Sequence, residues 1–71
     1  MEIKKRFGSA VKKRRTALGV SREELALRID AGQAYVSRVE AGQMNVTLES
    51  AEQIASALET DIAELFKIPL R

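Results

Sequence analysis

Apolar residues recur along the first part of the chain at the spacing of an amphipathic helix. Ile3, Phe7, Val11 and Leu18 follow one another at intervals of four, four and seven residues. Such intervals place the four side chains on one face of a helix. Gly19 interrupts the pattern and can end a helix. The pattern therefore predicts a first helix from about residue 3 to residue 18, with these four side chains facing the core.

The segment 21–42 has the signals of two short helices joined by a tight turn. Ser21 and Glu24 have the spacing of a capping box at the start of the first helix. Asp30 is one of the few residue types that tolerate a left-handed turn. Gly32 can begin the second helix and Gly42 can end it. We interpret residues 22–41 as a helix-turn-helix, a geometry that suits the major groove of DNA.

The second helix of this motif has one apolar side and one polar side. At 100° per residue, Val36 and Val39 face inward. The opposite side has groups that can contact base edges: an amide, a guanidinium, a hydroxyl and a methyl group. An ordinary solvated helix also presents such residues, but the capped motif favours base reading. The candidates for base reading are Gln33, Ala34, Ser37 and Arg38.

Two further helices are predicted after the motif. Thr47 can cap a helix whose apolar residues share one side, and Asp61 with Glu64 forms a second capping box before a short last helix that Pro69 ends. We expect an all-α fold, a compact five-helix domain that spans residues 1–71. The apolar residues expected on the inner side of the fourth helix are Leu48, Ala51, Ile54, Ala55 and Leu58.

Composition excludes several function classes. The 71 residues include no cysteine and no histidine, so disulfides, zinc–thiolate sites and the commonest general base are absent from the chain. We predict no enzymatic activity, no metal and no cofactor. No apolar run approaches the roughly 20 residues of a membrane span, so we expect a cytoplasmic protein. With a core this small, oligomerisation is a natural source of stability, and we expect no small-molecule effector.

Charge is distributed unevenly along the chain although the net charge is only +2. Residues 1–15 carry seven basic residues and one acid, whereas residues 48–71 carry two basic residues and five acids. A basic first segment is typical of a surface that faces phosphates. The alternative is that these lysines are merely solvated. We take Lys13, which lies off the apolar face of the first helix, as a candidate for phosphate binding.

The run from Phe7 to Phe66 resembles the lambda-repressor and Cro-like family of helix-turn-helix regulators, also called Xre-type. The segment AYVSRVEAGQMNVTLE is most similar to the small controller proteins of restriction-modification systems. The resemblance implies a transcriptional regulator that binds double-stranded operator DNA. The positions that carry the resemblance are Leu25, Ala26, Val36, Ser37, Val39, Glu40, Gly42, Asn45, Leu48, Ala55, Leu58, Leu65 and Phe66.

The resemblance also implies roles for individual residues. Arg15 and Glu40 match an ion pair that ties the first helix to the recognition helix. Two positions depart from the family pattern, because Arg22 stands where glutamine is usual and Asp30 where glycine is often found. Arg22 lies at the start of a helix, where an anion is favoured. Asn45 can serve its turn or contact a phosphate. The candidates for phosphate binding are Arg22, Tyr35, Gln43, Asn45 and Lys13.

The C-terminal segment has more apolar surface than one short helix can bury. We expect part of it to form a homodimer interface, although at least one of Leu65 and Phe66 can belong to the core instead. Dimerisation would place two recognition helices about 34 Å apart, which predicts a pseudo-palindromic operator. The alternative function is a protein-interaction module, resembling an antitoxin, on the same scaffold. The candidate interface residues are Leu65, Phe66, Ile68 and Leu70.

Overall fold

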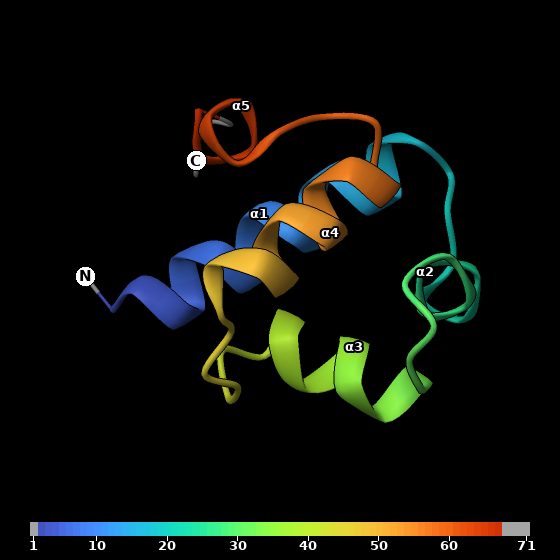
Figure 1. Ribbon diagram of the computed structural model, residues 1–71. Coiled ribbons are helices and arrows are strands. Elements are labelled where there is room, and N and C mark those ends of the chain that lie inside the picture. The colour runs from blue at the N-terminus through green and yellow to red at the C-terminus, as the bar shows by residue number, and fades with distance from the viewer. Residues whose placement is uncertain (1, 68–71) are drawn as a thin grey trace.

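The computed structural model describes residues 2–67, and every regular element among them is a helix (Figure 1). The expected all-α class and the number of helices are confirmed. None of the described helices is both long and apolar enough to cross a membrane. The helices are α1 (Ile3–Ala17), α2 (Arg22–Arg28), α3 (Gln33–Glu40), α4 (Leu48–Ala57) and α5 (Ile62–Phe66).

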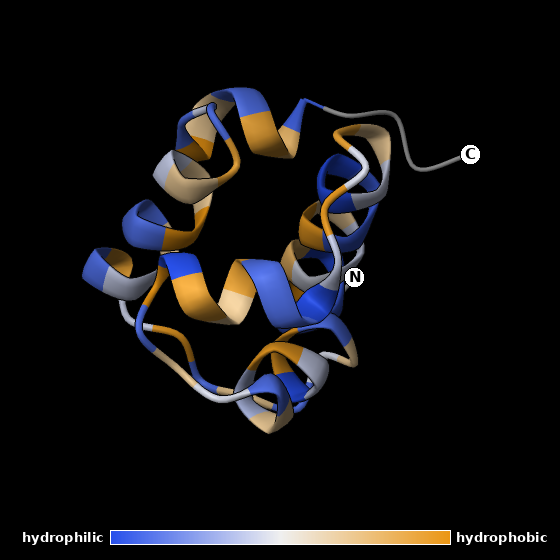
Figure 2. Ribbon diagram, turned by 90° about the vertical axis from the view of Figure 1, so that its right-hand side faces the viewer, coloured by the Kyte–Doolittle hydropathy of each residue, from blue (hydrophilic) through white to orange (hydrophobic). Residues whose placement is uncertain are grey.

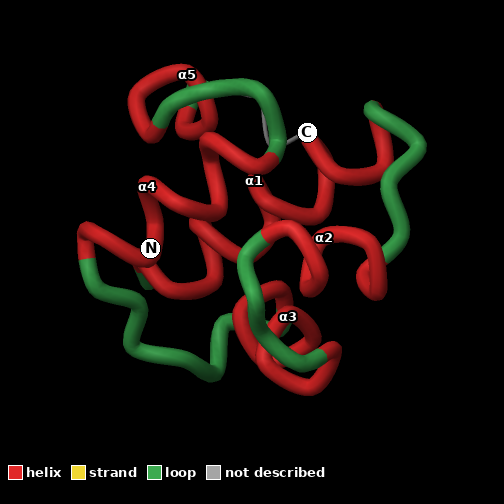
Figure 3. The backbone as a smooth tube through the Cα atoms, turned by 45° about the vertical axis from the view of Figure 1, so that its right-hand side comes forward, coloured by secondary structure: helices red, strands yellow, loops and turns green. Residues whose placement is uncertain are grey.

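The helices enclose one core. Helix α3 packs on α1 and on α2, and α5 packs on α1 and α4. Figures 1 and 3 show α2 and α3 gathered on one side and α5 near the opposite end of the molecule. Each helix alternates apolar and polar residues (Figure 2), as expected for helices that bury one face. The largest fully buried side chains are Val11, Leu25, Val36, Ile54, Leu58 and Leu65.

Two side chains predicted to face the core are exposed. Ile3 is 62% exposed and Leu48 is 81% exposed. Each is the first residue of its helix, in α1 and α4 respectively. A helical period assigns a residue to a face, but it does not tell where the neighbouring element ends. These two residues lie at the rim of the core, so the prediction that they are buried is wrong.

Side-chain caps begin three of the helices where the sequence indicates them. The Ser21 hydroxyl accepts a bond of 3.0 Å from the Glu24 amide, and the Thr47 hydroxyl accepts one of 3.0 Å from the Ser50 amide. Asp61 accepts a bond of 2.8 Å from the Glu64 amide. These bonds satisfy amide groups that a helix start leaves without partners. The predicted starts of α2, α4 and α5 are therefore confirmed.

Neither predicted capping box is complete, because the glutamate carboxylates bond elsewhere. Glu24 accepts from Arg28 at 3.1 Å, and Glu64 accepts from Lys67 at 3.4 Å. Both partners lie further along the same helical face, where exposed side chains of opposite charge meet. Each glutamate therefore supports its own helix through a surface ion pair.

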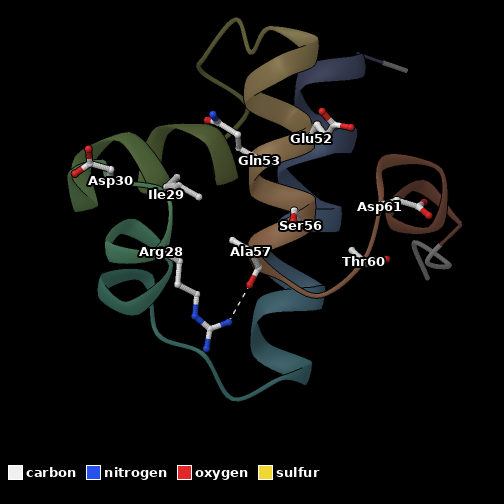
Figure 4. Close-up of a pocket in the computed structure, with 9 residues that line it drawn as sticks. All are labelled: Arg28, Ile29, Asp30, Glu52, Gln53, Ser56, Ala57, Thr60 and Asp61. Carbon is white, nitrogen blue, oxygen red and sulfur yellow. Dashed lines mark hydrogen bonds between the residues drawn. The ribbon is translucent and has the colours of Figure 1, made fainter.

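Two arginines hold the C-terminal end of α4. Arg14 of α1 donates to the Leu58 carbonyl at 2.9 Å and to the Glu59 carbonyl at 3.1 Å. Arg28 of α2 donates to the Ala57 carbonyl at 2.8 Å (Figure 4). Cations at a helix C-terminus satisfy its last carbonyls and complement the helix dipole. These bonds join α4 to both helices and were not predicted from the sequence.

Candidate nucleic-acid interface

A short left-handed turn connects α2 to α3. Asp30 has a φ of 55°, and the amide of Ala31 donates to the Ala26 carbonyl at 2.9 Å. Gly32 then provides the extended N-cap residue of α3. The role predicted for Asp30 in the turn is confirmed. Since the turn is this tight, α3 lies directly against α2, which is the arrangement of a helix-turn-helix.

The inner face of α3 is held against α1 by a backbone contact. Val36 and Val39 are each only 2% exposed. Gly8 of α1 faces the end of α3, where a Cβ atom would lie 2.7 Å from the Glu40 carbonyl oxygen. No side chain fits at such a distance. Glycine at this position therefore lets the two helix backbones approach each other and fixes the depth at which α3 sits.

The ion pair predicted between Arg15 and Glu40 is present beside this contact. Arg15 Nε donates to Glu40 Oε2 at 2.6 Å, and Nη2 donates to Oε1 at 3.1 Å. Its third nitrogen donates to the Val20 carbonyl at 2.9 Å. The exposed fractions of the two side chains are 9% and 3%. This bidentate pair ties the C-terminal end of α3 to α1.

Arg22 joins the same carboxylate from α2. Its Nε donates to Glu40 Oε1 at 3.1 Å, while its side chain stays 45% exposed. Burial alone raises the pKa of Glu40, but the hydrogen bonds and charges of Arg15 and Arg22 outweigh burial, so its pKa lies below its ordinary value. Glu40 is thus a charged link between α1, α2 and α3. The sequence suggested only one of its two partners.

The outer face of α3 lies on the opposite side from these contacts. All four candidates for base reading, which are Gln33, Ala34, Ser37 and Arg38, are exposed. Gln43 and Asn45, in the loop after α3, are also exposed, whereas Tyr35 is half-buried and packs against the core. The structure therefore brings four small or polar side chains to one accessible helix face. We call these four residues the outer face of α3.

The basic residues of the first segment differ in how exposed they are. At least three of the seven make contacts within the protein: Arg14 bonds to α4, Arg15 is buried, and the Arg6 guanidinium lies 5.7 Å from the centre of the Phe66 ring. Lys13 is half-buried. The count of charges in the sequence thus overstates how many cations are fully exposed, because the helical period spreads these residues around α1.

The residues predicted at a dimer interface have different environments. Leu65 is 0% exposed, so it belongs to the core, and its assignment to a partner surface is wrong. Phe66 is half-buried, with its ring centre 5.8 Å from that of Phe7. Ile68 and Leu70 lie outside the described residues. Of the two members of this predicted set that the structure describes, Phe66 is the one whose position is compatible with a partner contact.

Comparison with known proteins agrees with this geometry. Residues 11–65 match the family described as helix-turn-helix. The chain belongs to the helix-turn-helix family. Among curated members, the chain is 39% identical to the control protein C.MunI of Mycoplasma sp over 66 residues, which cover 92% of this chain and 89% of that protein. The resemblance inferred from the motif residues is therefore confirmed.

Solved structures of this family have the same fold. The restriction-modification controller protein C.AhdI of Aeromonas hydrophila superimposes with a TM-score of 0.81 at 39% identity, over 86% of this chain and 92% of that chain. The controller protein C.Esp1396I, solved as a tetramer with its natural 35 base-pair operator, gives 0.81 at 28% identity, over 90% and 84%. These two controller proteins therefore share the overall fold of this chain.

Proposed function

We propose that this protein is a sequence-specific DNA-binding regulator of transcription that reads its operator with the outer face of α3. The observation that carries this proposal is the contrast between the two sides of α3. The inner side is fixed by the Gly8 contact and by Glu40, and the four side chains of the outer side are exposed. A rigid helix with accessible polar groups is what major-groove recognition requires.

Each residue of the outer face has a chemical role in this proposal. Arg38 can donate two hydrogen bonds to a guanine edge, and Gln33 can form a bidentate pair with adenine. Ser37 can bond to a base or to a phosphate, and Ala34 offers its methyl group to a thymine. All four side chains are exposed, so none must leave the protein core to reach DNA.

Phosphate contacts would fix the register of α3 in the groove. Arg22 is the best placed, because Glu40 holds its Nε while nearly half of its side chain stays exposed at the start of α2. An anion at this position also gains from the helix dipole. Gln43 and Asn45 would contact phosphates beyond the end of α3. We propose that Tyr35 and Lys13 contact the DNA phosphates as well.

We propose further that the protein acts as a homodimer on a pseudo-palindromic operator, as a controller of restriction-modification genes. The relatives named controller proteins support this, as does the tetramer of C.Esp1396I on its operator. In this proposal the protein has no enzymatic activity and needs no cofactor. Because its ligand is DNA, it would act in the cytoplasm.

Selection of binding sites from random duplex DNA tests this function. At about 0.15 M salt, non-specific attraction to phosphates is already weakened. We expect enrichment of a two-fold symmetric site with half-sites about one helical turn apart. If folded protein enriches no sequence, the proposal fails, and the same scaffold must serve another purpose, such as binding a protein.

A further inference from the structure

Most cationic residues in the described part of the chain interact with other groups of the protein. All arginines of α1 and α2 do so, and so do Lys13 and Lys67. Among residues 2–67, three exposed cationic side chains have no hydrogen bond, ion pair or ring contact: Lys5, Lys12 and Arg38. Arg38 is already a proposed base-reading residue. The two lysines therefore carry charge for which the described part of the protein offers no partner.

A close backbone contact places Lys5 at the end of α3. Gly42, the residue after the C-cap of α3, has a φ of 74°. A Cβ atom on Gly42 would lie 2.6 Å from Lys5 Cγ and 2.9 Å from Lys5 Cα. Glycine at this position therefore permits both the left-handed turn and the approach of the first turn of α1. As a result, Lys5 borders the start of the loop that follows α3 (Figure 1).

The loop beside Lys5 also holds residues that the proposed function places on DNA. The Gln43 amide donates to the Arg38 carbonyl at 2.9 Å, so the start of the loop is tied to the last turn of α3. Gln43 and Asn45 are exposed in this loop and are proposed phosphate contacts. Lys5 is exposed at the first residue of the same loop and supplies the positive charge that these two amides lack.

We propose that the Lys5 ammonium binds a phosphate of the DNA backbone beside the end of α3. A recognition helix in the major groove lies between two phosphate backbones, so a cation next to its end can reach one of them. A lysine stem is long and flexible, and its ammonium acts as a point charge that needs no fixed geometry. The inference rests on the proposed function, because the phosphate belongs to the DNA that α3 would read. From the sequence, Lys13 was the candidate on α1, yet Lys13 is half-buried and Lys5 is exposed.

Lys4 provides a matched comparison for Lys5. It precedes Lys5 in the same turn of α1, but it is half-buried and lines an apolar hollow together with residues of α4 and α5. Removing either charge changes the net charge of this turn equally, so the long-range electrostatic effect on DNA is matched. A difference between the two variants therefore reports a direct contact of Lys5.

A purely structural role for Lys5 predicts a different result. An ammonium near a helix C-terminus can interact with the last carbonyls and with the helix dipole. In that role Lys5 would raise the unfolding temperature and would release no counterion from DNA. A phosphate contact instead contributes to the salt dependence of DNA binding.

Salt titration of duplex binding tests the inference with Lys5→Gln, Lys5→Arg and the control Lys4→Gln. Lys5 is exposed and glutamine is a good helix former, so circular dichroism should show an unchanged unfolding temperature for Lys5→Gln. The binding constant is measured on the selected operator and on a random duplex from about 0.05 M to about 0.2 M salt. One phosphate contact adds about 0.9 to the slope of log K against log salt, so the advantage of the wild type over Lys5→Gln should shrink about 3.5-fold across this range on both duplexes. Lys5→Arg keeps the charge, so it should follow the wild-type slope, and so should Lys4→Gln.

Three outcomes overturn the inference. The first is an unchanged slope for Lys5→Gln, which leaves the proposed function intact if an operator is still bound. The second is an equal loss of slope in Lys5→Gln and Lys4→Gln, which would reflect net charge alone. The third is a lower unfolding temperature of Lys5→Gln without a change of slope, which would assign Lys5 to the end of α3 itself.

The random duplex separates this inference from the proposed function. A smaller slope for Lys5→Gln on random duplex supports the phosphate contact even if no operator is found, in which case sequence reading by α3 alone fails. If the wild-type protein binds no duplex at the lowest salt, both fail.

Discussion

The two faces of α3 differ in what constrains them. The inner face is fixed by the α1 backbone at Gly8 and by the buried carboxylate of Glu40. The outer face consists of four exposed side chains. If the proposed function is right, one short helix separates two tasks: its inner side sets the position of the helix, and its outer side recognises DNA. Changes on the inner face should act on stability, and changes on the outer face should act on DNA binding.

The largest expected effect comes from removing the carboxylate of the inner face. Glu40→Ala leaves the Arg15 guanidinium, in a residue that is 7% exposed, without its charged partner. An unpaired buried charge of this kind costs about 3–5 kcal/mol in the free energy of unfolding. Denaturant unfolding measures the loss. The control Glu24→Ala removes an exposed pair with Arg28 and should change stability by less than about 1 kcal/mol. Equal losses in both variants would contradict the role given to Glu40.

A smaller loss is expected when the helix–helix contact is forced apart. Alanine normally stabilises a helix by about 0.5–1 kcal/mol relative to glycine. In Gly8→Ala, however, the new methyl group meets the backbone of α3, so we expect a net loss of about 1–3 kcal/mol. Gly32→Ala is the control, because no atom lies within 4 Å of its added Cβ. Stabilisation by Gly8→Ala would show that the two helices are not in contact as described.

Acid should reduce the stability that Glu40 provides on the inner face of α3, because its carboxylate becomes protonated. The pKa of Glu40 is lowered in the folded protein, so its contribution to stability is present above the unfolded-state pKa of about 4.3 and is lost as pH falls through the folded value. Unfolding free energies measured between about pH 6 and pH 3 should therefore decrease more steeply in the wild type than in Glu40→Gln. If the unfolding free energies of the two proteins decrease in parallel with pH, the pKa of Glu40 is not lowered by Arg15 and Arg22 as described.

Arg22 bonds to Glu40 and is also a proposed phosphate contact. Its substitution by alanine should have the smallest effect on stability. Its side chain is 45% exposed, so Arg22→Ala should lower the unfolding free energy by less than about 1 kcal/mol. Binding to all DNA sequences should weaken about equally, and the salt slope of binding should fall by about one. Arg28→Ala, on the same helix but bonded to α4, serves as control and should keep the wild-type slope. A change in base preference after Arg22→Ala would contradict its phosphate role.

Local signals made much of the fold predictable from the sequence. Ser21, Thr47 and Asp61 cap helices through bonds to residues three positions away, so their role depends on nothing distant. The turn at Asp30 is equally local, because it reflects the backbone preference of one residue type. The exposed outer face of α3 followed from the helical period once Val36 and Val39 were assigned inward.

Contacts between distant segments were not predictable in the same way. Arg14 and Arg28 look like any surface arginine, and only the folded chain brings them to the end of α4. Gly8 did carry a signal, since a glycine inside a helical pattern can mark a close approach of two backbones. The exposure of Ile3 and Leu48 depends on where neighbouring elements end, which a periodic pattern does not contain.

Binding of Arg38→Ala to the selected operator and to its single-base variants, measured together with its thermal stability, decides whether the outer face of α3 reads bases. Arg38 is exposed on the outer face, so we predict an unchanged unfolding temperature. We also predict that Arg38→Ala loses about 1–3 kcal/mol of binding free energy on the operator. The variant should lose its preference at one base position and keep its preferences at all the others. An equal loss on operator and random DNA would show instead that Arg38 contacts phosphate, and that the outer face of α3 does not read bases as proposed.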